Sequence, residues 1–171
     1  QNVINNNNLK LVAYGNEDMS FISDKDCKHL FNNGFESIPR LIEYVHFNKD
    51  KPQYHNIYIS NMQNNWVMLY NGRIWKLSDR EEIIDDLFSN GRDFLIEKFE
   101  TFEKVAEELD EAILRKFNRY LRQQDDNDVV NRIKKDIRLI LYNNRKIPEN
   151  TRHLLGLDES EDILGKLLKD K

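Results

Sequence analysis

The chain has 171 residues and a formal net charge of −4, which excludes the overall basic character of a protein that coats nucleic acid. Its single cysteine, Cys27, excludes an internal disulfide and a multi-cysteine zinc site. No apolar run reaches the ~20 residues of a membrane helix and no secretory signal pattern is present, so we expect an intracellular protein without a membrane contact.

The N-terminal part of the sequence predicts a leader, a strand and a helix. Residues 1–8 are rich in asparagine, which is typical of a flexible leader. The apolar run at 9–14 indicates a short strand. Ser23 and Asp26 then match a capping box at the start of a helix, and Gly34 stands where a helix would end.

A second helix is expected to begin near Ser37. Pro39 would lie in its first turn, where the missing N–H costs little. The apolar residues that follow have helical spacing, and the polar stretch 48–52 marks the end of the helix.

The middle of the chain carries the clearest β-strand pattern. Three runs rich in β-branched and aromatic residues lie at 57–59, 66–70 and 73–77. Asn71 and Gly72 join the last two, and Asn-Gly favours the two-residue type I′ turn of an antiparallel hairpin.

The rest of the sequence predicts helices. Ser78 and Glu81 match a second capping box, and Gly91 is expected to end the helix that it starts. A long amphipathic helix over 93–124 should follow.

The C-terminal part predicts a helix over 128–144, ended by Pro148, and a short helix near 163–168. The fold class is therefore α+β, with N-terminal helices, a small antiparallel sheet and a helical C-terminal half. We expect an α+β domain over 9–91 and a helical extension over 92–171, packed on that domain or used for oligomerisation.

Large apolar residues recur along the long helix at spacings of three and four, as in a coiled-coil seam. Phe102 and Leu109 are expected at the centre of this seam, and its candidate residues are Leu95, Phe99, Phe102, Leu109 and Ile113. The seam is covered either within the chain or by a second copy. Because a helix of this length exceeds what a small sheet can cover, we predict a homodimer formed through the C-terminal helices.

His46 and His55 bracket a polar segment rich in asparagine. This composition suggests a metal-dependent nuclease site, in which a histidine acts as general base beside metal ligands. A polar loop with turn-forming residues explains the same pattern. No helix supplies a further ligand soon after His55, so we predict no metal and no cofactor.

Basic residues cluster in the hairpin and in the C-terminal helices. The candidates for phosphate contact are Arg73, Lys76, Arg119, Arg122, Arg132, Lys135 and Arg138. A solvated helix face is the alternative interpretation of the same residues.

Three segments carry a family resemblance: YGNEDMSFIS at 14–23, PQYHNIYISN at 52–61 and LYNGRIWKL at 69–77. They resemble a domain found at the C-terminus of multi-domain proteins of giant DNA viruses of amoebae. In those proteins a C2H2 zinc finger or a KilA-N-type DNA-binding domain precedes it. The resemblance spans about residues 9–124 and carries over no catalytic residue.

The resemblance implies a location in the host cytoplasm or the viral factory. The predicted function is a non-catalytic viral accessory module that mediates oligomerisation or partner contacts of a DNA-associated protein. Its partners would be a second copy and viral or host proteins, with nucleic acid as a further possibility. A metal-dependent nuclease and direct nucleic-acid binding are the two alternatives.

Overall fold

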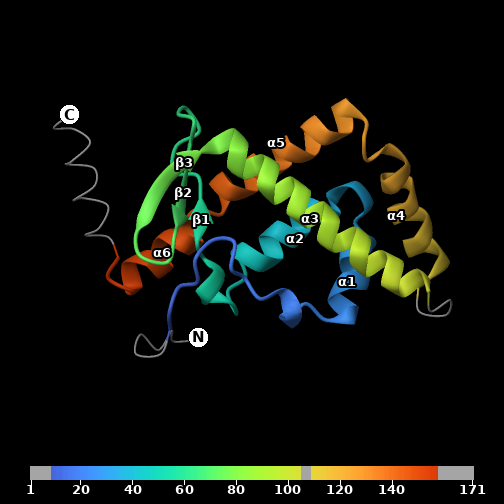
Figure 1. Ribbon diagram of the computed structural model, residues 1–171, viewed down its shortest axis with the longest axis horizontal. Coiled ribbons are helices and arrows are strands. Elements are labelled where there is room, and N and C mark those ends of the chain that lie inside the picture. Colours follow the sequence, from blue (N-terminus) through green and yellow to red (C-terminus); the bar gives the residue numbers. More distant parts are fainter. Residues whose placement is uncertain (1–8, 105–108, 158–171) are drawn as a thin grey trace. The chain divides into compact units, whose positions relative to one another are not determined.

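The computed structural model describes residues 9–104 and 109–157 and has the predicted α+β class. Its sheet contains β1 (Ile57–Tyr58), β2 (Trp66–Tyr70) and β3 (Trp75–Asp79). The helices are α1 (Asp24–Phe31), α2 (Ser37–His46), α3 (Arg80–Glu103), α4 (Glu111–Gln123), α5 (Asn127–Asn143) and α6 (Lys146–Leu154), as labelled in Figure 1. Short 3-10 turns are η1 (Met19–Phe21), η2 (Gly34–Glu36) and η3 (Pro52–Tyr54).

The described residues form two compact units, each assembled from segments that are distant in the sequence. The strand unit combines 9–17, Val45–Arg80 and 141–157, and the helical unit combines Asp18–Tyr44, 81–104 and 109–140. The predicted boundary between residues 91 and 92 falls inside α3.

The sheet of the strand unit is antiparallel, with strand order β1-β2-β3. β2 has the predicted bounds, but β3 begins two residues later than predicted, because Tyr70 pairs with Trp75. The connection therefore has four residues, and the predicted two-residue turn is wrong. Type I′ needs positive φ at both central residues, whereas Gly72 has φ +98° and Asn71 does not have positive φ. The side chain of Asn71 instead accepts hydrogen bonds from the backbone N–H groups of Arg73 and Ile74, both at 2.9 Å.

The segment 9–14 is not a strand, so that prediction is also wrong. Val12 N–H donates to the carbonyl of Gln53 (2.9 Å), and Tyr14 N–H donates to that of Tyr70 (2.8 Å). These bonds reach two different parts of the chain, so no ladder forms. The turn at Gly15 then redirects the backbone with φ +95°.

In the helical unit, the capping box of α1 is confirmed. The Ser23 hydroxyl accepts from Asp26 N–H (3.1 Å), and the Asp26 carboxylate accepts from Ser23 N–H (3.0 Å). The same carboxylate accepts the Tyr44 hydroxyl at 3.0 Å, which links α1 to α2. α2 begins at Ser37 as predicted.

The predicted start and end of the next helix are wrong. Ser78 lies in β3, and α3 continues through Gly91. A Cβ atom at position 91 would lie 3.2 Å from Ile38 Cγ2. Gly91 therefore allows close packing against α2 and does not end the helix.

The predicted single helix over 93–124 is two helices. α3 ends at Glu103, and α4 begins after Asp110, whose carboxylate accepts from Ala112 N–H at 2.9 Å. The two helices bring Phe99 and Phe117 together with ring centroids 4.6 Å apart. Phe31 of α1 packs against both rings, at 5.2 and 5.0 Å.

The predicted oligomer seam is therefore largely covered within the chain. Leu95, Phe99 and Phe102 are buried in the helical unit, whereas Leu109 and Ile113 are half-buried. The first three residues need no second copy to cover them, which removes the reason for placing a dimer contact there.

The last described helices follow the prediction in part. α5 matches the expected helix within a residue at each end. Pro148, however, does not end that helix, because it lies in the first turn of α6. The predicted leader 1–8 and the helix near 163–168 lie outside the described residues. Across 9–104 and 109–157, no helix is long and apolar enough to cross a bilayer.

Candidate functional site

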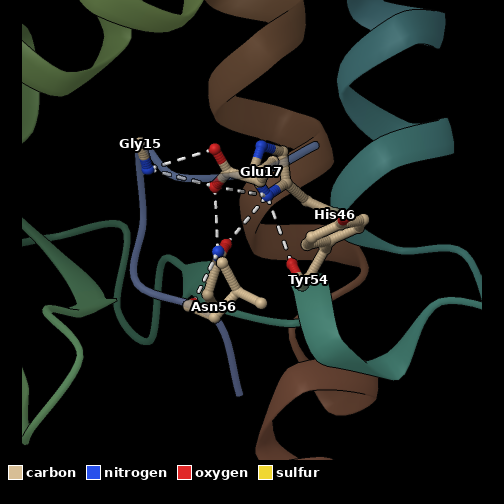
Figure 2. A network of polar contacts seen from close by, with 6 residues as sticks. Gly15, Glu17, His46, Tyr54 and Asn56 are labelled. Atoms are coloured by element: carbon tan, nitrogen blue, oxygen red, sulfur yellow. Dashed lines mark hydrogen bonds and ion pairs between the residues drawn. The ribbon is translucent and has the colours of Figure 1, made fainter. Parts of the chain in front are cut away.

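His46, the last residue of α2, lies in a buried polar network of the strand unit (Figure 2). Its Nδ1 atom is 2.9 Å from Asn56 Oδ1 and 3.2 Å from the carbonyl oxygen of Tyr54. Both neighbours are hydrogen-bond acceptors only, so Nδ1 must carry the hydrogen. The ring is therefore the Nδ1–H tautomer when neutral, and the lone pair lies on Nε2.

Asn56 connects His46 to the N-terminal segment. Its amide nitrogen donates to Glu17 Oε1 (2.9 Å) and to the carbonyl of Val12 (3.1 Å). The Glu17 carboxylate also accepts the backbone N–H of Gly15 at 3.1 Å. Figure 2 shows Glu17, Asn56 and His46 converging from three separate segments of the chain. The backbone carbonyl of Asn56 in addition accepts from Tyr70 N–H of β2 at 2.9 Å.

The charge state of this network follows from its burial. Burial lowers the pKa of His46, and the nearby Glu17 carboxylate opposes this without reversing it. Nδ1 lies 4.0 Å from Glu17 Oε1, a contact that becomes an ion pair only if the imidazole is protonated. At neutral pH we therefore expect a neutral imidazole beside a carboxylate that is hydrogen-bonded to Asn56 and Gly15.

His55 has a separate set of contacts. Its Nε2 lies 2.6 Å from the carbonyl of Asn48, and its Nδ1 lies 2.7 Å from the hydroxyl of Thr151 in α6. Burial lowers the pKa of His55, although the bond to Asn48 acts in the opposite direction. Both ring nitrogens are thus engaged with groups of the strand unit.

The chemistry available to the two histidines is limited by these contacts. A metal-dependent nuclease needs several ligands at one point beside a general base. Within the part of the chain that the structure describes, no three His, Cys, Asp or Glu residues are grouped so as to hold a metal ion. His46 and His55 instead link the N-terminal segment, the loop after α2 and α6 to the sheet.

Arg152 is a further buried charged residue that the sequence analysis did not single out. It is 1% exposed, its Nη1 donates to the Tyr58 hydroxyl at 2.9 Å, and its guanidinium lies 5.1 Å from the centre of a Trp75 ring. Glu17 was likewise missed, and Asn56 stood out only as one of the asparagines near His55. Asn56 bonds to Val12, 44 residues away in the sequence, and Arg152 bonds to Tyr58, 94 residues away. No local sequence pattern therefore indicates these contacts.

The predicted phosphate contacts lie in both units. Arg73 and Lys76 are exposed on the hairpin of the strand unit. In the helical unit, Arg119 and Arg122 belong to α4, and Arg132, Lys135 and Arg138 belong to α5. Arg138 forms an ion pair with Glu81 at 3.3 Å, and Lys134 forms one with Asp85 at 2.8 Å. Cations along α5 are therefore interleaved with carboxylates.

The strand unit also exposes large apolar side chains at the end of its sheet. We call Met62, Trp66 and Leu77, which are 37%, 47% and 45% exposed, the Trp66 surface. Trp66 pairs with Asp79 and Leu77 pairs with Met68, so Trp66 and Leu77 are diagonal neighbours on one face of the sheet.

The loop between β1 and β2, which carries Met62 and leads into Trp66, is held by Arg80, which is only 6% exposed. Its guanidinium donates to the backbone carbonyls of Asn61 (2.8 Å), Met62 (3.2 Å) and Trp66 (3.1 Å). Hydrogen bonds from a charged donor are among the stronger ones in proteins. The backbone beneath the Trp66 surface is therefore fixed.

Comparison with known proteins finds no matching family model, no matching curated protein and no matching solved structure. The resemblance to a domain of giant-virus proteins therefore stays a prediction.

Proposed function

We propose that the chain is a non-catalytic module that binds a protein partner through the Trp66 surface, and that this partner is a second copy of the chain. The observation that carries the proposal is an exposed tryptophan at the start of β2, whose backbone carbonyl and preceding loop are held by a buried arginine. Trp and Met are enriched at protein interfaces. A preorganised backbone also lowers the entropy lost on binding.

A second copy fits this surface for two reasons. A two-fold contact would bring the same three side chains from both copies together and remove their apolar area from water. Leu95, Phe99 and Phe102, three of the five residues predicted for self-association, are already covered within the helical unit. Because three side chains per copy make a small contact, we expect a dissociation constant on the order of micromolar.

The polar residues support a non-catalytic role. The ring nitrogens of His55, and Nδ1 of His46, are bonded to groups that hold chain segments together. The resemblance to giant-virus proteins adds a biological setting. In that setting, the contact would pair DNA-associated proteins in the host cytoplasm or viral factory.

Sedimentation velocity over 1–100 μM protein tests the contact. We expect the average mass to rise from 20.5 kDa toward twice that value, and Trp66→Ser to shift the midpoint at least tenfold upward. Leu139→Ser is the matched control, because Leu139 is an exposed apolar residue of α5 outside the Trp66 surface. A monomer at every concentration, or equal effects of both substitutions, would contradict the proposal.

A second assay tests the absence of catalysis. We expect supercoiled and single-stranded DNA to stay intact in the presence of magnesium or manganese. Cleavage by the wild type that is lost in His46→Gln or His55→Gln would replace the proposal by the nuclease alternative.

A further inference from the structure

A small polar pocket lies within the helical unit, where η2, α4 and α5 meet. Its volume is about 190 Å³, and the residues that matter for its chemistry are Phe35, Glu36, Arg119, Arg132, Ile133 and Asp136. The pocket is independent of the Trp66 surface, which belongs entirely to the strand unit.

The wall of the pocket is built by close packing of η2 on α4. Gly34 has φ +55°, and a Cβ atom there would lie 3.3 Å from the backbone oxygen of Lys116. The Phe35 ring packs edge-on against Tyr120, with centroids 5.9 Å apart. The hydroxyl of Tyr120 is buried, and burial raises its pKa to about 12. The aromatic side of the pocket is therefore anchored in the core of the unit.

The charges around the pocket balance but do not pair with one another. It has two guanidinium groups, on Arg119 and Arg132, and two carboxylates, on Glu36 and Asp136. In the described part of the chain, none of these four groups takes part in an ion pair, whereas Lys134 and Arg138 on the same α5 helix do. Arg132 and Asp136 are four residues apart on one helix face, a spacing at which pairing is geometrically easy.

Burial orders these groups by depth. Ile133 is buried, Glu36 and Asp136 are half-buried, and Arg119 and Arg132 are exposed. A ligand would therefore place a cationic group toward the half-buried carboxylates and an anionic group toward the arginines at the rim. Its apolar part would lie against Phe35 and Ile133.

The volume limits the size of the ligand. A volume of about 190 Å³ accommodates a single amino acid. From the balanced charge, the apolar wall and the volume, we propose that the pocket binds a free zwitterionic α-amino acid with an aliphatic side chain.

Titration calorimetry on the whole chain tests this with leucine as the probe. Leucinamide lacks the carboxylate, and N-acetylleucine lacks the ammonium group. We expect saturable binding of leucine and at least tenfold weaker binding of both analogues. The proposal would be overturned if leucine showed no saturable binding at concentrations up to about 10 mM, or if either analogue bound as tightly as leucine.

Variants locate the binding. Arg132→Gln and Asp136→Asn should each weaken leucine binding at least tenfold. Arg122→Gln is the matched control, because Arg122 is exposed on α4 and does not line the pocket. An equal loss in the control would overturn the assignment to this pocket. If Asp136→Asn fails to fold, Glu36→Gln removes the other half-buried negative charge and should also weaken leucine binding at least tenfold.

Discussion

The two units of the chain are held together in different ways. The interior of the helical unit is dominated by aromatic rings, with Phe31, Phe99 and Phe117 in mutual contact. The strand unit buries polar groups beside its apolar core: His46, His55, Asn56, Thr151 and Arg152 are each at most 5% exposed.

This difference determines how each unit responds to change. An apolar core loses stability when atoms are removed, through lost burial and the cavity left behind. A buried polar network loses stability when one partner is removed, because the remaining donors and acceptors then have no hydrogen-bond partner, neither water nor protein. It also responds to pH when it contains histidine.

The largest expected effect is on the aromatic core. Phe99→Ala should lower the free energy of unfolding by about 3–5 kcal/mol, because the ring is 1% exposed and contacts two other rings. Urea denaturation followed by circular dichroism measures this. Leu139→Ala, at an exposed position on α5, should cost less than about 1 kcal/mol. Similar losses for both variants would show that the rings do not form the core.

The polar network of the strand unit should be the next most sensitive. Asn56→Ala leaves Glu17 and the Val12 carbonyl without their amide donor. We expect a loss of about 2–3 kcal/mol, because a buried polar group without a partner costs about 1–3 kcal/mol. Asn65→Ala, at an exposed position in the β1–β2 loop, is the control and should change little. An unchanged free energy of unfolding in Asn56→Ala would mean that the network does not contribute to stability.

Stability should also fall on mild acidification. The pKa values of His46 and His55 are lowered in the folded chain, so the unfolded chain binds protons first as the pH falls through about 6.5. Stability is therefore fully present above that pH and is lost below it. The limiting slope is about 1.4 kcal/mol per pH unit for each histidine.

Denaturation midpoints between pH 8 and 5 test this dependence. His55→Gln should flatten the decline, and His29→Gln, at an exposed position, is the matched control. A flat profile in the wild type would contradict the expected neutral, buried state of both rings.

The smallest effect concerns the hairpin loop. Gly72→Val should cost about 1 kcal/mol or more, because a β-branched residue disfavours the φ of +98° found there. A thermal melt compares it with Arg73→Ala, which changes the neighbouring exposed residue. Equal melting temperatures for the two variants would argue against the positive φ.

Local patterns predicted much of the secondary structure. The Ser23–Asp26 capping box, the start of α2 and the bounds of β2 follow from residues close in sequence. Gly91 was misread because its reason is tertiary: it faces Ile38 from another helix. The sequence predicted one helix where α3 and α4 are separate, because the apolar spacing of three and four residues continues from one helix into the next.

The candidate site was only half visible in the sequence. His46 and His55 stood out by residue type, but their partners are set by the fold. Thr151 is 96 residues from His55 and Glu17 is 39 residues from Asn56, so no spacing rule links them. The same long-range assembly makes both units discontinuous in sequence.

The nitrogen-15 spectrum of the His46 ring at pH 7 would show whether this histidine is a structural connector. Long-range proton–nitrogen correlation distinguishes the two neutral tautomers and the imidazolium. With Asn56 and Tyr54 both accepting at Nδ1, we expect a neutral ring with its hydrogen on Nδ1, and exposed His29 supplies a reference in the same spectrum. A hydrogen on Nε2 alone, or a fully protonated ring, would contradict the network in Figure 2 and the structural role assigned to it.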